Sequence, residues 1–275
     1  MLFKCIIATL LASTAFVESS IRNVPTTIDL PEEFHIGLSL DVGTHTRKFL
    51  GATNSQRRLG PSIAEAKRFS IDVVKQLNSL YGAPAQCKTS LVRASANIFT
   101  DVEYGFAVGV SPGSTRSFSN SFTKRLNPLL LTKNAENYSQ RVWRSRATKS
   151  NVIMGVKGIL RNMGFNGESR LNAWASTRKS FAVLVSGGKH QICSKSAFGC
   201  RRELEAYVAS ELEKHQKLTF VFVYPEGSDG EKNLFRIGDF GSKGKYNDRV
   251  RVVRIARMKG LGKDVTEAVV NAIQN

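Results

Sequence analysis

Two short apolar runs constrain the fold of this chain more than any other feature of its sequence. Residues 181–185 are all apolar, residues 218–224 nearly so, and polar or glycine residues bound the first run on both sides. Apolar runs of this length, rich in β-branched and aromatic residues, are typical of strands that are covered on both faces. We therefore expect an open sheet with helices packed on each side.

Helical patterns alternate with strand patterns along the rest of the chain. Apolar residues recur at a spacing close to 3.6 in the expected helices, which are 63–80, 152–163, 201–214 and 265–273, with a shorter one near 128–138. The other expected strands are 34–41, 89–92, 94–99, 104–110 and 250–255. Strands 94–99 and 104–110 are close enough to form a hairpin. The order predicts an α/β domain with an open, mostly parallel central sheet, helices on both faces and one antiparallel hairpin.

The first residues have the pattern of a secretory signal. Lys4 precedes an apolar stretch that ends at Val17, and small residues at Ala15 or Ser19 suit cleavage. The stretch is shorter than the roughly 20 apolar residues that a membrane helix needs, and no later apolar run is long enough either. We expect a secreted, extracellular protein without a membrane span, although a retained anchor is the alternative. The expected parts are a signal peptide (1–19), an extended lead-in (20–33) and one domain (34–275).

The expected mature chain is strongly basic. Forty Lys and Arg against 22 Asp and Glu give a formal charge of +18, and residues 1–19 contain one cation and one acid, so their removal leaves this balance unchanged. Such an excess attracts polyanions through long-range fields and counterion release. Outside a cell the available polyanions are sulfated glycans, anionic lipids and acidic proteins. Charge that serves solubility alone is the other explanation.

Three cysteines follow the expected signal peptide. Cys193 and Cys200 enclose a small loop rich in turn-forming residues, so they are the natural disulfide pair in an oxidising compartment. Cys87 is then odd, and it is either buried or linked to another chain. Asn137 begins an N-glycosylation triplet in a polar stretch, although such triplets also occur by chance.

Ligands of open parallel sheets bind beyond the carboxyl ends of the strands. Asp41 ends the first expected strand, and residues 186–188 follow a buried one. A basic segment, 111–151, precedes the helix expected at 152–163, and it contains eight Lys or Arg residues and a single acid. All three features are expected at this edge of the sheet.

The order of these elements and their loops resembles a von Willebrand factor type A domain over residues 34–275. The resemblance rests on Asp41-Val42-Gly43-Thr44-His45 after the first strand, Ser150 and Gly155-Val156 around the second helix, and Ser186-Gly187-Gly188 after the buried strand. Proteins of that family typically hold a divalent ion at the strand-carboxyl edge. An Asp-x-Ser-x-Ser loop, a Thr and a second Asp supply its ligands, and the ion then accepts an acidic group from the partner.

Few of these ligands are present in this chain. The matching positions hold Asp41, Gly43 and His45 in the first loop, Ser150 or Thr148 in the second, and Gly187 in the third. Glycine offers no side-chain oxygen to a hard cation that prefers octahedral oxygen ligands. No cofactor is therefore expected, and Asp41, His45 and Ser150 are the candidate ligands if a divalent cation does bind. The simpler role for Asp41 is to cap a turn or helix.

The basic border of this edge is the preferred binding surface. Arg141, Arg144, Arg146 and Lys149 could hold carboxylate or sulfate groups directly, with bidentate hydrogen bonds from the arginines. A solvated loop face is the alternative. The sequence thus favours a secreted adhesion or ligand-binding domain for an acidic protein or a sulfated glycan. A structural, matrix or coat component that self-associates, with Cys87 linking chains, is the alternative function.

A second basic concentration surrounds the last expected strand. It contains Lys243, Lys245, Arg249, Arg251, Arg254, Arg257 and Lys259. The alternation of Arg249 and Arg251 with valines predicts cations on one face of this strand. The simplest explanation is a charged sheet edge that resists aggregation, and a second polyanion contact is the other.

Catalytic patterns are weak. His190 and Cys193 are close together, but the cysteine is better explained by a disulfide, and the four histidines lack metal-ligand spacing. Gly244-Lys245 is followed by Tyr246 instead of the Ser or Thr of a phosphate loop. No stacking motif of the kind that nucleic-acid modules use is found. We expect neither an enzyme nor a nucleic-acid-binding protein.

Overall fold

A computed structural model describes residues 34–41, 59–81, 92–99, 110–113, 149–165, 177–187, 189–190, 197–228, 246, 248–256 and 261–275. The expected signal peptide and lead-in, the helix near 128–138, the glycosylation triplet at Asn137 and Cys87 lie outside these residues, as do Cys193 and the first half of the loop that Cys193 and Cys200 enclose.

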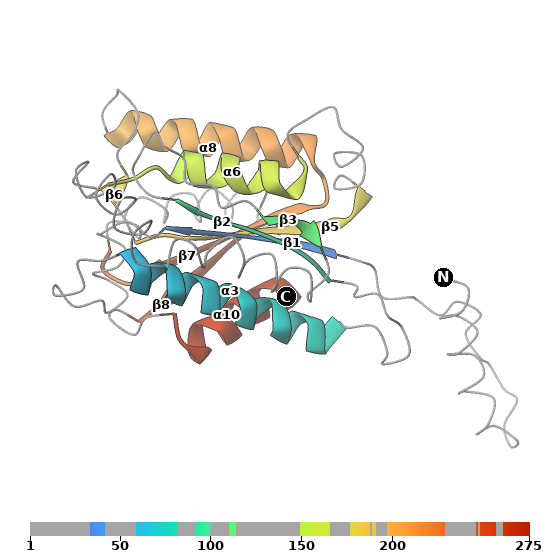
Figure 1. Cartoon of the computed structure of the whole chain (residues 1–275). Helices are drawn as coiled ribbons and strands as arrows, with labels where there is room; N and C mark the ends of the chain where they lie inside the picture. Colours follow the sequence, from blue (N-terminus) through green and yellow to red (C-terminus); the bar gives the residue numbers. More distant parts are fainter. Residues whose placement is uncertain are drawn as a thin grey trace, which may run out of the picture.

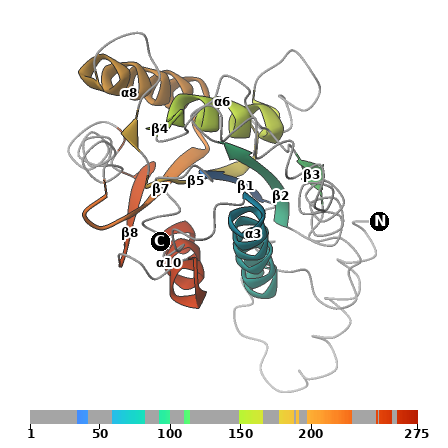
Figure 2. The same cartoon turned by 60° about the vertical axis from the view of Figure 1, so that its left-hand side comes forward.

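A six-stranded sheet forms the centre of the described structure. In spatial order its strands are β3 (Val110–Gly113), β2 (Val92–Phe99), β1 (Phe34–Asp41), β5 (Lys179–Val185), β7 (Leu218–Pro225) and β8 (Val250–Ile255). The five strands from β2 to β8 are parallel to their neighbours, and β3 is antiparallel to β2. Figure 2 shows β3 and β8 at the two opposite edges. The predicted open α/β class is confirmed.

The antiparallel part of the sheet differs from the expected hairpin. β3 is Val110–Gly113 instead of the expected 104–110, and residues 100–109 lie outside the described ones. β2 runs without a break from Val92 to Phe99, so it joins the strand expected at 94–99 to Val92, whereas residues 89–91 lie outside the described ones. Arg93 does not interrupt it, because this residue keeps its place in the ladder opposite His35 near the start of both strands.

Four described helices cover the sheet, two on each face. α3 (Leu59–Tyr81) and α10 (Lys263–Gln274) lie on one face, and α6 (Val152–Met163) and α8 (Ala197–Lys214) lie on the other (Figure 1). Each pair of helices packs against the sheet around a separate cluster of buried apolar residues. Every residue of β7 is buried, and β5 is buried from Ser180 onward, as expected for strands covered on both faces.

The ends of α6 follow from local sequence signals. The Asn151 side chain accepts a hydrogen bond from the Met154 amide at 3.0 Å, which satisfies one of the free N–H groups of the first turn. Gly164 ends the helix with φ of 93°, a left-handed conformation that glycine adopts without steric cost. These two residues give α6 the boundaries that its apolar pattern predicted.

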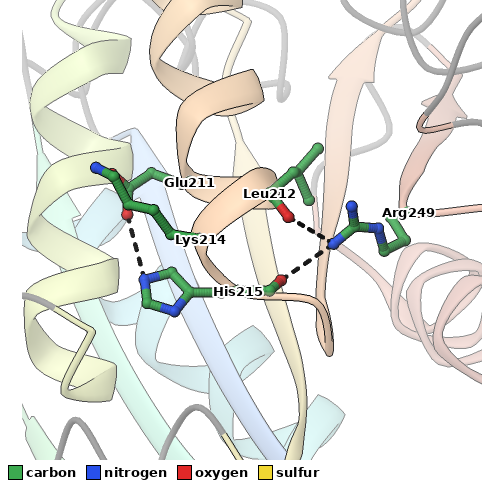
Figure 3. Close-up of polar contacts among 5 residues, drawn as sticks. All are labelled: Glu211, Leu212, Lys214, His215 and Arg249. Carbon is green, nitrogen blue, oxygen red and sulfur yellow. Dashed lines mark hydrogen bonds and ion pairs between the residues drawn. The ribbon is translucent and has the colours of Figure 1, made fainter.

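Arginines beside β8 cap helices on both faces of the sheet. Arg249 directly precedes this edge strand, and its Nη1 donates to the carbonyl oxygens of Leu212 at 2.7 Å and His215 at 3.1 Å at the end of α8 (Figure 3). Within the strand, the Arg251 Nη1 donates to the carbonyls of Ala272 and Ile273 in the last turn of α10. A cation at these carbonyls also interacts favourably with the negative end of the helix dipole. The prediction that both cations lie on one face is wrong, since α8 and α10 lie on opposite faces.

Two histidines lie near the amino ends of the strands. His35 is fully buried, and its Nε2 is 2.9 Å from the Ser95 Oγ. Burial, together with the nearby charges of Arg93 and Arg178, lowers the pKa of His35 to about 3. His215 follows α8, and its Nε2 lies 3.6 Å from a carboxylate oxygen of Glu211 (Figure 3). Burial also lowers the pKa of His215, although the Glu211 charge acts in the opposite direction.

Candidate functional site

The carboxyl ends of β1 and β5 meet through a buried hydrogen bond. Asp41 is the last residue of β1, and its Oδ2 accepts a hydrogen bond of 2.7 Å from the Ser186 Oγ, directly after β5. The Asp41 side chain is only 4% exposed, and Ser186 is fully buried. The carboxylate therefore joins the ends of two neighbouring strands, a contact that the sequence did not predict. Its charge is turned away from solvent.

Hydrogen bonds from the sheet hold the first turn of α6 close to Asp41 and Ser186. The carbonyl oxygen of Gly155 accepts a hydrogen bond from the Ser39 Oγ at 3.1 Å and one from the Asn97 Nδ2 at 3.5 Å. A Cβ at Gly155 would lie 2.6 Å from the Phe99 ring, so only glycine allows this close approach. The helix N-terminus is thus held above β1 and β2, where the two strands end.

A small parallel sheet borders the same edge. β4 (Lys149–Ser150) pairs with β6 (Lys189–His190), so that Lys149 lies opposite Lys189 and Ser150 lies opposite His190. β4 leads directly into the Asn151 cap of α6, and β6 follows Gly187 after a single intervening residue. Neither two-residue strand was expected from the sequence.

The predicted site residues are only partly within the described structure. Asp41, Lys149, Ser150 and Gly187 belong to this edge, whereas His45, Arg141, Arg144, Arg146 and Cys193 lie outside the described residues. Cys200 lies within α8. The described residues contain no group of three or more His, Cys, Asp or Glu that could hold a metal ion. Because His45 is not among them, the degenerate cation site remains a prediction, as do the disulfide and the arginine surface.

Replacing Ser186 by Ala is expected to lower the free energy of unfolding by about 2 kcal/mol. The change leaves a buried carboxylate without one of its hydrogen-bond donors, and hydrogen bonds to charged groups are worth about that much. Urea denaturation measures the decrease. The matched control is Ser79→Ala, which removes an exposed hydroxyl bonded to the Gln76 carbonyl and should cost no more than about 0.5 kcal/mol. Equal decreases would contradict the structural role of the Asp41–Ser186 pair.

None of the described helices combines the length and the apolar character that crossing a bilayer requires.

Comparisons with known proteins give distant structural similarities. No family model matches the chain, and no curated protein matches it. The human COPII-coat protein Sec24c is similar with a TM-score of 0.48 and 9% identity over 90% of this chain and 32% of that one. The PilB minor pilin from Streptococcus sanguinis has a TM-score of 0.48 and 10% identity over 94% and 65%. The pilus adhesin SpaC from Lactobacillus rhamnosus GG has a TM-score of 0.43 and 9% identity over 91% and 30%.

These similarities are too distant to transfer a function. The chain spans about a third of the length of Sec24c and of SpaC, and somewhat less than two thirds of PilB. The fold class stands on the sheet and helices described above. The von Willebrand factor A resemblance remains a prediction from the sequence.

Proposed function

We propose that this chain is an extracellular ligand-binding domain of the adhesion type, and that it holds an acidic or sulfated partner at the carboxyl edge of its sheet. The residues proposed to carry binding are Lys149 and Lys189 in the small sheet, with Arg141, Arg144 and Arg146 in the preceding basic segment. The proposal requires neither a reaction nor a cofactor.

The register of β4 with β6 supports this proposal most directly. It sets Lys149 opposite Lys189 on adjacent parallel strands, so two cationic residues share one position of the small sheet. An anionic group bound beside this position would be close to both residues. Two lysines from segments 40 residues apart in sequence then contribute to one binding surface.

The surroundings of the small sheet favour an anion as well. Ser150 directly precedes Asn151, the N-cap residue of α6. The first turn of this helix contains no acidic residue, so no side-chain negative charge in that turn neutralises the positive end of the helix dipole. The nearby Asp41 carboxylate is buried against Ser186 and presents almost no surface to a ligand. An acidic partner would therefore approach an edge of predominantly positive potential.

Salt-dependent retention on a heparin column tests the proposal. The double variant Lys149→Gln with Lys189→Gln, and the triple variant Arg141→Gln, Arg144→Gln and Arg146→Gln, should each elute at clearly lower salt than the unmodified chain, because fewer cations at the edge displace fewer counterions from the glycan. The matched control is Lys157→Gln with Lys217→Gln, which removes two exposed lysines from elsewhere on the surface. Elution of the control and of the Lys149→Gln, Lys189→Gln variant at the same salt would show that only net charge matters, because both proteins lose two cations.

Calorimetry with Mg²⁺, Mn²⁺ and Zn²⁺ tests the metal-free part of the proposal. We expect no saturable heat of binding at this edge. Tight binding that Asp41→Asn abolishes would contradict direct recognition by cations and would restore the metal-bridged mechanism that the resemblance implies.

A further inference from the structure

A second polar surface lies on the other face of the sheet, in a groove between α3 and α10. These two helices pack against each other on the same face (Figures 1 and 2). The groove has a volume of about 510 Å³, within the range of small-ligand sites. One side is formed by α3 residues at successive helical turns, including Arg68, Asp72 and Lys75, and the other side by the start of α10.

Three cations surround this groove from both helices. Arg68 and Lys75 come from α3, Lys263 comes from α10, and all three are exposed. The Arg68 Nη2 donates to the Leu261 carbonyl at 3.4 Å, which draws the guanidinium across toward α10. Lys263 has an ion pair of 3.5 Å with Glu267, and its side chain is 87% exposed. No ion pair joins Lys75 to another described residue.

The start of α10 adds hydrogen-bond donors to the groove. Gly262 is the N-cap residue, and as a glycine it has no side chain to accept a hydrogen bond from the amides of the first turn. Gly262 and Lys263 both line the groove. The first turn of α10 contains one acid, Asp264, so the groove's attraction for an anion rests on the three cations.

Among the described residues, Asp72 is the single acid that lines the groove, and it restricts what the groove can hold. It stands one turn after Arg68 and one turn before Lys75 and Gln76, yet no ion pair joins it to either cation. A bare anion gains nothing from this carboxylate. A ligand that also carries hydroxyl groups can donate a hydrogen bond to it while its anionic group contacts the cations.

We propose that the groove between α3 and α10 binds a sugar that carries a sulfate or phosphate ester. The tetrahedral oxyanion contacts Arg68, Lys75 and Lys263, and a ring hydroxyl donates to Asp72. This site lies on the helical face opposite α6, so it is independent of the binding edge proposed above.

Calorimetry with galactose 6-sulfate, galactose 6-phosphate, galactose and inorganic sulfate tests the proposal. The two esters are expected to bind more than tenfold more tightly than galactose or inorganic sulfate, and comparison of the esters distinguishes the two oxyanions. Arg68→Gln with Lys75→Gln should weaken ester binding at least tenfold. Asp72→Asn should weaken ester binding, whereas the weak binding of inorganic sulfate should stay the same or tighten, because the change removes a neighbouring negative charge. Lys217→Gln, an exposed lysine away from the groove, is the matched control and should bind as the unmodified chain does.

Several results would overturn this assignment. The site is wrong if neither ester binds, or if Arg68→Gln with Lys75→Gln binds the esters as tightly as the control. Binding of inorganic sulfate as tight as that of the esters would reduce the groove to an adventitious anion site. The heparin experiment separates this proposal from the edge proposal, because Lys149→Gln with Lys189→Gln should leave ester binding in the groove unaltered.

Discussion

Lowering the pH from 7 to 4 is expected to reduce the free energy of unfolding by about 3 kcal/mol through His35 alone. Burial and two nearby arginines lower the pKa of this histidine from 6.5 to about 3 in the folded protein. The unfolded chain therefore takes up a proton as the pH falls below 6.5, while the folded protein does not until the pH approaches 3. The stability that His35 contributes is complete above pH 6.5 and is lost progressively between these two values.

Urea denaturation at a series of pH values measures this dependence, and His35→Gln is the informative variant. Glutamine retains an amide donor for the Ser95 hydroxyl but does not titrate, so its stability should change much less between pH 6.5 and 4. His215→Gln is the comparison, because the pKa of His215 is also lowered by burial and its replacement removes part of the same slope. A His35→Gln protein with the full pH dependence would show that other groups dominate acid unfolding.

Replacing Gly155 by Val is expected to destabilise the protein by about 3 kcal/mol, which is at the upper end of the usual cost of overpacking. The added Cβ would lie 2.6 Å from the Phe99 ring, and that ring is 2% exposed and has little space to move into. α6 would have to move away from β1 and β2. The hydrogen bonds from Ser39 and Asn97 to the Gly155 carbonyl would lengthen as a result.

Thermal or urea unfolding measures the effect, with Gly262→Ala as the matched control. A Cβ at Gly262 meets no atom within 4 Å, so this substitution should change stability by no more than about 1 kcal/mol. The Gly155→Val protein should also elute from heparin at lower salt, since the start of α6 follows β4 directly and a shift of the helix would displace Lys149. Stability equal to that of the control would mean that α6 can shift without cost.

The apolar patterns predicted the main elements of this fold because those patterns reflect burial directly. The run 181–185 lies within β5, where every residue after Lys179 is buried. The apolar residues spaced from Val152 to Met163 predicted both ends of α6. The break expected near Arg93 was wrong, because one charged side chain near the start of a strand can reach solvent without leaving the ladder.

The candidate site was less predictable because its contacts join residues far apart in the chain. Asp41 and Ser186 are separated by 145 positions, and only the parallel pairing of β1 with β5 brings them together. The pairing of Lys149 with Lys189 involves strands of two residues, too short for any periodic signal. Arg249 and Arg251 alternate with valines, a pattern typical of a strand with one face in solvent. In the structure, however, both arginines donate hydrogen bonds to helix carbonyls. The sequence pattern shows which residues are polar, but it does not show which groups they contact in the fold.

The position of Arg249 and Arg251 next to and within the last strand has a consequence for the order in which the protein is completed during synthesis. The carboxyl end of α8 is made more than 30 residues before Arg249, and Arg251 in turn precedes the carbonyls of α10 that it contacts. The end of α8 therefore cannot receive its arginine cap until the strand β8 has been made and has docked beside β7. A chain interrupted before residue 249 would lack the cap of α8 together with β8 and α10, so the carbonyls at the end of α8 would be left to solvent.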